Sequence, residues 1–220
     1  MRSAPSLWRL IAATLWLAGS IAAQAAPLGV HSSPHTLDPE HKKQTQFGKL
    51  IFVSGLVLKS DSADFGGYSG LLISADGQRL LAISDKGHWL SAGLVYRDEK
   101  LIGVTGAENS PLLDEAGNSL LVKQSADSES LTAEQPGDLT GPVLVSFERN
   151  HRLLRYGGID RKPELLAMPP QLRGAPPNGG IEALERRADG ALIALTEKWL
   201  DENGNHIGWL IGADGAREIR

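Results

Sequence analysis

The stretch that decides the fold is residues 178–198, which read NGGIEALERRADGALIALTEK. Its apolar residues form two runs on either side of Asp189-Gly190. This pattern predicts a β-hairpin with a two-residue type I′ turn, because that turn needs positive φ at both central positions. Counting outward from such a turn places Glu182 directly opposite Glu197, about 5 Å apart. Two carboxylates in that position destabilise a hairpin, so a compensating role is expected for them.

The rest of the chain has the composition of a globular protein rich in turns. Its 220 residues are 41% hydrophobic and 22% charged, and its 25 glycines and 12 prolines separate short apolar runs. Such a sequence predicts an all-β fold. The residues after position 26 carry 20 basic side chains (22 less Arg2 and Arg9) and 26 acidic ones, a formal charge of −6. This balance argues against nucleic acid as a partner and suits hard cations.

The N-terminus has the pattern of a secretory signal peptide. Arg2 and Arg9 precede an apolar run over 10–23, and Ala23-Gln24-Ala25 forms a cleavage signal. We therefore expect residues 1–25 to be a signal peptide and the protein to be periplasmic or secreted. The alternative is an uncleaved membrane anchor, but the apolar run is short for a span. Because the chain has no cysteine, its stability must come from its core or from bound metal.

Residues 26–47 have the character of an exposed leader, which leaves 48–220 as the domain. His31 and His35 are four residues apart, a spacing that suggests a metal site on a helix. Pro34 lies between them and disfavours that helix.

The sequence pattern of this hairpin occurs three times along the chain, the hairpin itself being the third. A small or acidic residue stands two places before a leucine, a Gly/Asp turn follows, and the next strand ends in an acid and a base. Repeats of four short strands predict β-propeller blades. The first residues of the three repeats are Ser69, Glu129 and Glu182, and the terminal pairs are Asp85-Lys86, Glu148-Arg149 and Glu197-Lys198.

In a propeller, the start of each first strand and the end of the second meet at one mouth of the central channel. Carboxylates that converge there either raise one another's pKa or recruit a cation. We expect a divalent cation, because calcium and magnesium both take oxygen ligands. Calcium is the first candidate. Its expected ligands are Glu129, Glu148, Glu182 and Glu197, and the expected catalytic set adds Asp85.

The bases that follow these acids leave two interpretations open. Lys86, Arg149 and Lys198 either bind an anionic substrate or neutralise ordinary solvated strand ends. His88 and His151 each lie three places after an acid, but the third repeat has Leu200 at that position. A shared histidine role therefore has support from two repeats only.

Five motifs together resemble the phytase-like domain family, whose members are described as having esterase-like activity of phytase. They are FGGYSGL (65–71), AISDKG (82–87), DSESL (127–131), VSFERNHRLLRY (145–156) and NGGIEAL (178–184). The resemblance implies a propeller-like fold and phosphoesterase activity carried by recurrent acids. Matched by position, those acids are Asp85, Glu129, Glu148, Glu182 and Glu197.

Family members usually continue past the point that corresponds to Arg220. The resemblance therefore implies an incomplete propeller with open strand edges, which favour self-association. We expect a metal-assisted phosphoesterase that acts on a small phosphate ester. The alternatives are a non-catalytic binding module on a propeller and a metal-dependent lactonase-type hydrolase, because propellers carry many unrelated functions.

Overall fold

The computed structural model describes residues 25–220, so the expected signal peptide lies outside the described residues except for Ala25. The described part is almost all strand and turn, which confirms the all-β prediction. Its helices are the short α1 (Lys123–Ala126) and the 3-10 helix η1 (Pro170–Gly174). Within residues 25–220, neither helix has the length and apolar character needed to cross a membrane.

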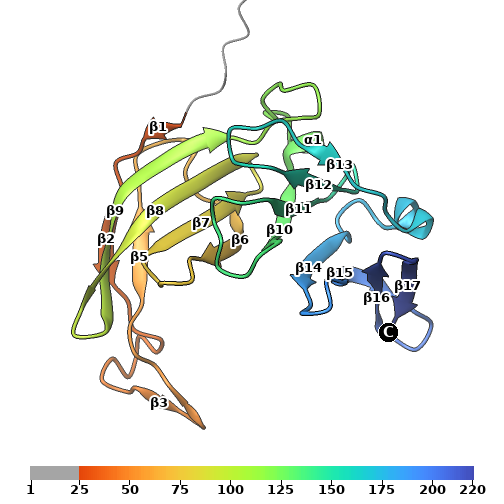
Figure 1. Cartoon of the computed structure of the whole chain (residues 1–220). Helices are drawn as coiled ribbons and strands as arrows, with labels where there is room; N and C mark the ends of the chain where they lie inside the picture. Colours follow the sequence, from red (N-terminus) through yellow and green to blue (C-terminus); the bar gives the residue numbers. More distant parts are fainter. Residues whose placement is uncertain (1–24) are drawn as a thin grey trace, which may run out of the picture.

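Three antiparallel sheets stand next to one another along the chain, and we call them blades 1, 2 and 3 (Figure 1). Blade 1 contains β6 (Tyr68–Ile73), β7 (Arg79–Ser84), β8 (His88–Arg97) and β9 (Lys100–Pro111), with β1 (Ala26–Pro27) added at the β9 edge. Blade 2 contains β10 (Ser128–Ala133), β11 (Val143–Phe147), β12 (Arg152–Tyr156) and β13 (Glu164–Leu165). Blade 3 contains β14 (Ile181–Arg186), β15 (Leu192–Leu200), β16 (His206–Gly212) and β17 (Gly215–Ile219).

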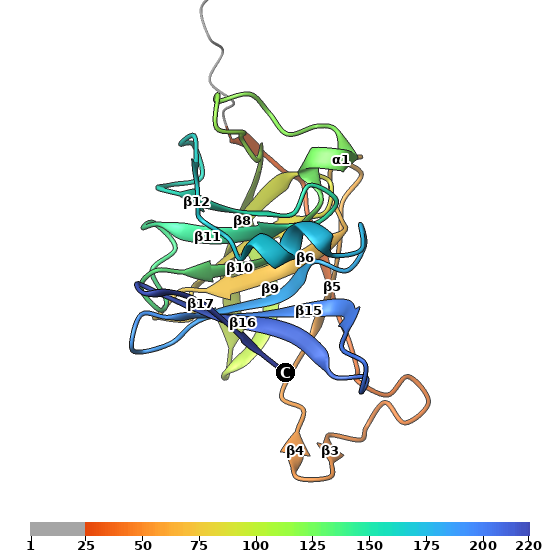
Figure 2. The same ribbon diagram turned by 90° about the vertical axis from the view of Figure 1, so that its right-hand side faces the viewer.

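The first strands of the blades lie next to one another in the order β6, β10, β14. The remaining strands of each blade extend away from these inner strands, as Figure 2 shows from the side. Within the described residues no sheet closes on another. The arrangement is that of an incomplete propeller, as the sequence predicted.

Apolar side chains between the blades hold them together. One cluster joins blades 1 and 2, and within it Trp89 meets Tyr156 edge to face with ring centroids 5.2 Å apart. A second cluster joins blades 2 and 3 around Trp209. The inner strands also form side-chain hydrogen bonds across the blades, since the Ser128 hydroxyl donates to the Ser84 carbonyl over 2.8 Å. Burial of these faces fixes the inner strands, and with them the positions of the repeated acids.

The expected leader is mostly exposed, but part of it joins the sheets. β2 (His31–Pro34) pairs with β5 (Leu56–Lys59), and β3 (Gln46–Phe47) forms a small hairpin with β4 (Leu50–Ile51). Leu28 and Val30 pack on the outer face of blade 1. Among the described residues, no group of metal-ligating side chains includes His31 or His35.

The predicted hairpin forms between β14 and β15, but the prediction of a two-residue turn was wrong. The Arg187 amide donates to the Ala191 carbonyl over 2.8 Å, which leaves a three-residue loop over 188–190. Only Gly190 has positive φ in this loop, at 85°. The Asp189 carboxylate accepts the Ala191 amide over 3.1 Å, a local bond that stabilises the longer turn.

A β-bulge at the other end of the hairpin changes the register again. Ile181 lies opposite Thr196, and Ala183 lies opposite Leu195, so Glu182 is the additional residue of a bulge. The prediction that Glu182 lies directly opposite Glu197 was therefore wrong. A bulge redirects a side chain relative to the regular pleat.

Candidate functional site

The same bulge occurs at the start of all three blades. Ser69 lies between the paired residues Tyr68 and Gly70, and Glu129 lies between Ser128 and Ser130. Ser69, Glu129 and Glu182 therefore occupy equivalent places in blades 1, 2 and 3. The repeat identified in the sequence is a repeat of bulges.

A second repeated feature positions the acids that follow the second strands. The amide of each acid donates to the carbonyl two residues before the bulge. These bonds join Asp85 to Gly67 over 2.8 Å, Glu148 to Asp127 over 2.8 Å and Glu197 to Gly180 over 3.2 Å. Each blade thus holds one acid beside its bulge.

Two overlapping groups of carboxylates result from this arrangement. In one group, oxygens of Asp127, Glu129 and Glu148 lie within 4.8 Å of one another. In the other, oxygens of Glu148, Glu182 and Glu197 do so. Glu148 belongs to both groups, and the four expected ligands Glu129, Glu148, Glu182 and Glu197 are all brought together.

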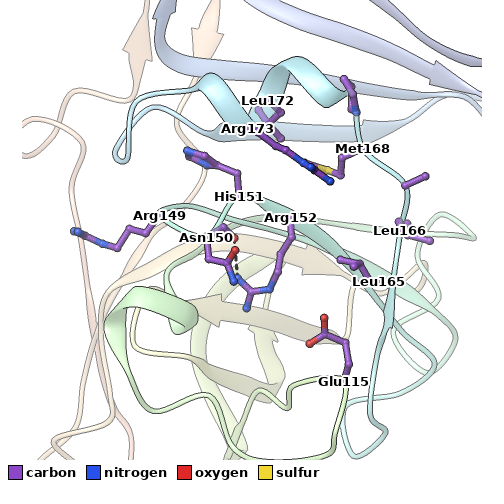
Figure 3. Close-up of a pocket in the computed structure, with 12 residues that line it drawn as sticks. Glu115, Arg149, Asn150, His151, Arg152, Leu165, Leu166, Met168, Leu172 and Arg173 are labelled. Carbon is purple, nitrogen blue, oxygen red and sulfur yellow. Dashed lines mark hydrogen bonds between the residues drawn. The ribbon is translucent and has the colours of Figure 1, made fainter.

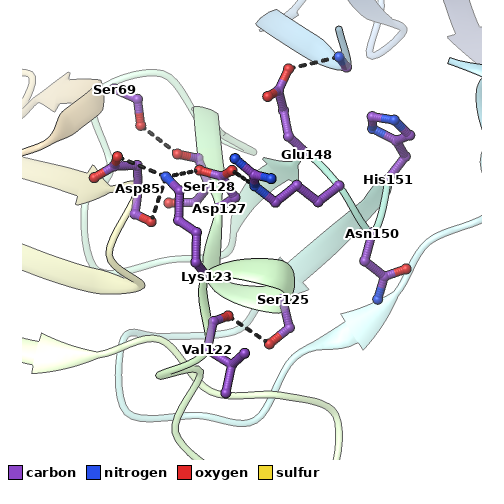
Figure 4. A network of polar contacts seen from close by, with 12 residues as sticks. Ser69, Asp85, Val122, Lys123, Ser125, Asp127, Ser128, Glu148, Asn150 and His151 are labelled. Carbon is purple, nitrogen blue, oxygen red and sulfur yellow. Dashed lines mark hydrogen bonds and ion pairs between the residues drawn. The ribbon is translucent and has the colours of Figure 1, made fainter. Parts of the chain in front are cut away.

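Asp85 lies outside these two groups and belongs to a chain of ion pairs (Figure 4). Lys123 on α1 contacts Asp85 over 2.9 Å and Asp127 over 2.5 Å. Arg149 contacts the other oxygen of Asp127 over 2.6 Å. The order of charges is therefore carboxylate, ammonium, carboxylate, guanidinium, and it links blade 1 to the β11–β12 turn.

The sequence analysis missed Asp127 and Lys123. Asp127 occupies the position that Gly67 and Gly180 occupy in the other blades. An alignment of the repeats would therefore have shown an aspartate where the other two have glycine. Its side chain is buried, and the two cations neutralise it. Lys123 gave no such signal, because α1 has no counterpart in the repeat.

The basic residues expected to bind substrate separate in space. Lys198 pairs with Glu197 over 2.7 Å and lies at the edge of the carboxylate groups. Arg149 is engaged by Asp127. Lys86 is elsewhere, where its ammonium donates to the carbonyls of Ala63 and Phe65 over 2.9 and 3.0 Å.

Negative charge at the site exceeds positive charge. The acids are Asp85, Asp127, Glu129, Glu148, Glu182 and Glu197, and the cations paired with them are Lys123, Arg149 and Lys198. Six carboxylates less three cations leave three carboxylates, those of Glu129, Glu148 and Glu182, without a partner charge among residues 25–220. Groups of this kind either hold protons or bind a cation.

The pKa values of two glutamates reflect this excess. Burial raises the pKa of Glu129 to about 8, and the nearby carboxylates of Glu182, Asp127 and Glu148 act in the same direction. Burial raises the pKa of Glu182 to about 7, with further contributions from Glu148 and Glu197. At neutral pH and without a bound cation, Glu129 is therefore mostly protonated and Glu182 is protonated about half of the time.

Glu148 is held in place by its surroundings. It is 4% exposed, and its Oε1 accepts the Gly180 amide over 2.8 Å. A Cβ at Gly180 would lie 2.7 Å from His151 Nδ1 and 3.2 Å from Glu148 Cγ. His151 in turn donates from Nε2 to the Pro176 carbonyl over 3.1 Å. Glycine at position 180 therefore lets the β11–β12 turn, with His151 and Glu148, approach the backbone that precedes β14.

Arg149 adopts a backbone conformation that is unusual for its residue type. Its φ is 58°, in the left-handed region that favours glycine. Its amide donates to the Pro177 carbonyl over 3.0 Å, and its guanidinium is bound by Asp127. These two contacts stabilise the turn that carries Glu148.

The donor set at the site suits a hard divalent cation. All ligand atoms in the two groups are carboxylate oxygens, which calcium and magnesium prefer. The spacing within 4.8 Å allows one ion to contact several of them. Burial, and after it the neighbouring carboxylates, raise the pKa of Glu129 and of Glu182, so a bound cation would offset a cost that the fold imposes on their charged forms.

A protein-family model described as Phytase-like, esterase-like activity of phytase, matches residues 63–217. The matched region includes β6 to β16, most of β17 and every residue of the two carboxylate groups. No curated protein matches the sequence.

Proposed function

This chain belongs to the phytase-like family, and from that premise we propose that it is a metal-assisted phosphoesterase. Family membership supports a hydrolase of the phytase-like kind. The convergence of carboxylates from blades 2 and 3 on Glu148 is the observation that carries the proposal further.

The proposed ligands of the cation are Glu129, Glu148, Glu182 and Glu197. Glu148 is central because it belongs to both carboxylate groups and because the Gly180 amide fixes its position. A divalent cation, with calcium as the first candidate, would polarise a phosphoryl oxygen and lower the pKa of a bound water. Glu129 and Glu182 must lose their protons when the cation binds.

The basic residues take different parts in this proposal. Lys198 is the best placed to contact a phosphate ester, because its side chain is 61% exposed and lies beside Glu197. An ammonium there would stabilise negative charge that develops on the phosphoryl group. Arg149 orients Asp127 and the β11–β12 turn. Lys86 has no role in binding the ester in this proposal, because its ammonium donates to two carbonyls away from the carboxylate groups.

Hydrolysis of a model ester tests the proposal. We expect the purified protein to release phosphate from p-nitrophenyl phosphate when calcium, magnesium or manganese is added, and to lose this activity in EDTA. Glu148→Gln should lower the rate at least tenfold, while its amide oxygen can still accept the Gly180 hydrogen bond. Glu185→Gln, an exposed change on the same strand as Glu182, should have no effect.

The same assay separates the alternative functions. Cation binding without turnover of phosphate esters would favour a non-catalytic binding module. Hydrolysis of lactones in preference to phosphate esters would favour a lactonase-type enzyme. Either result would reject the phosphoesterase.

We also infer that the protein is exported to the periplasm or secreted. The support is the signal-peptide pattern of residues 1–25. N-terminal sequencing of protein recovered from the periplasmic fraction tests this, with a mature N-terminus at Ala26 as the expected result. Recovery of the intact chain from the cytoplasm would contradict it.

A further inference from the structure

A cavity of about 680 Å³ lies on the side of the β11–β12 turn near η1 (Figure 3). Its size is in the range of small-molecule sites. Its wall includes the basic side chains of Arg152 and Arg173 and the apolar side chains of Leu165, Leu166 and Met168. In Figure 3 Arg173 lies beside Met168 on the η1 side, and Arg152 lies across from it. The proposed cation ligands do not line this cavity.

Arg152 is a buried cation without a carboxylate partner among the described residues. It is 7% exposed, and its guanidinium lies 4.0 Å from the centroid of the Phe147 ring. It donates to the carbonyls of Asn150 over 2.9 Å and Ser125 over 2.5 Å. A guanidinium has five donors in a planar fork that matches carboxylate and phosphate oxygens. A buried charge of this kind is costly unless a partner neutralises it.

The other charged groups around the cavity leave an excess of positive charge on its wall. Arg173 on η1 is exposed, and no ion pair engages it within residues 25–220. Arg149 is neutralised by Asp127, and in Figure 3 its guanidinium points away from Arg152. Glu115 is the one acidic residue of the wall, and it lies on an exposed turn.

We propose that this cavity binds an organic phosphate, with the phosphate group on Arg152 and Arg173. The organic part would then lie against Leu165, Leu166 and Met168. Two of the five N–H donors of Arg152 are used by carbonyls, so three remain for phosphate oxygens, and Arg173 adds positive charge from η1. This site requires no divalent cation, so it stands apart from the proposed phosphoesterase chemistry.

Phenylphosphonate is a suitable probe, because its carbon–phosphorus bond resists hydrolysis by a phosphoesterase. Isothermal titration calorimetry in EDTA should show saturable binding to the wild-type protein. Inorganic phosphate should bind more weakly, because it leaves the apolar wall uncovered. Added salt should weaken both interactions.

Three exposed substitutions test the site with little risk to the fold. Arg173→Gln should weaken phenylphosphonate binding about tenfold, as expected for the loss of a hydrogen bond to a charged group. Glu115→Gln should strengthen binding, because it removes the opposing carboxylate. Arg97→Gln, an exposed arginine at the far end of β8, is the matched control and should leave binding unchanged.

Absence of saturable binding, or equal affinities for the wild type and Arg173→Gln, would overturn the anion site. Equal affinities for phosphate and phenylphosphonate would overturn the role of the apolar wall. Glu182→Gln should bind phenylphosphonate as the wild type does. A protein that binds no divalent cation could therefore still bind phenylphosphonate, so the two proposals can fail separately.

Discussion

At the scale of single residues, the site is defined by carboxyl groups that the fold leaves without enough partners. Asp127 has two cations and is satisfied. Glu129 has no cation beside it in the described part of the chain, and burial together with three neighbouring carboxylates raises its pKa to about 8. The difference shows which residues serve the fold and which are available for a ligand.

The raised pKa values predict how stability depends on pH in the absence of cations. The folded pKa of Glu129, about 8, is above the ordinary glutamate value of 4.5, so the folded state binds more protons than the unfolded state between these pH values. The free energy of unfolding should therefore fall as pH rises from about 4.5 to about 8. Glu129→Gln should make this dependence shallower. Urea denaturation in EDTA at several pH values measures the effect, and equal slopes for the two proteins would contradict it.

The left-handed backbone at Arg149 gives a prediction that separates conformation from charge. Arg149→Gly and Arg149→Ala both remove the guanidinium that contacts Asp127. The glycine variant should nevertheless be the more stable of the two by about 1 kcal/mol, because glycine adopts positive φ without a Cβ penalty. Chemical denaturation measures the difference. An alanine variant as stable as the glycine variant would mean that the turn relaxes to another conformation.

At the scale of elements, the repeated β-bulge explains why acids gather at one end of the blades. The sequence predicted the hairpin and the four glutamates that the structure brings together, but the prediction assumed a regular register. That register failed because Asp189 stabilises a three-residue turn and because Glu182 is an additional residue in its strand. At the bulge the buried residues Ile181 and Leu184 are three positions apart instead of two, but the apolar Ala183 between them makes the segment resemble an ordinary apolar strand.

The close packing at Gly180 yields a test of how the strands position Glu148. Gly180→Ala places a Cβ 2.7 Å from His151 Nδ1 and 3.2 Å from Glu148 Cγ. We expect a loss of about 1–3 kcal/mol in the free energy of unfolding, together with weaker cation binding. Gly157→Ala is the matched control, since a Cβ there would meet nothing within 4 Å. Similar behaviour of the two variants in denaturation and calorimetry would refute the packing argument.

At the scale of the whole molecule, the blades are held by apolar contacts between neighbouring sheets, and the ring remains open within the described residues. The repeat, the all-β class and the incomplete propeller were all predictable from the sequence. Lys123 and the cavity near η1 were not, because α1 and η1 lie outside the repeat. Their contacts depend on how the blades pack, which the local sequence does not encode.

The open flank of blade 1 predicts self-association. Leu71 is 59% exposed and Ile73 is 41% exposed on the same face of β6. We expect sedimentation velocity to show concentration-dependent dimers, because exposed apolar faces and strand edges favour pairing with a second copy. Leu71→Ser should reduce the association. Leu50→Ser, a change at an exposed leucine of the β3–β4 hairpin, is the control, and a wild-type monomer at all concentrations would contradict the prediction.

The central claim is that the carboxylates around Glu148 hold a divalent cation, and the change in melting temperature on addition of calcium or magnesium tests it most directly. Protein freed of metal with EDTA is compared with protein at about a hundredfold excess of cation over the dissociation constant, where binding adds about 2.7 kcal/mol to the free energy of unfolding. The melting temperature of the wild type and of Glu185→Gln should rise equally, and that of Glu182→Gln should rise less. Unchanged melting temperatures in all three proteins with both cations would show that these carboxylates hold protons and no metal.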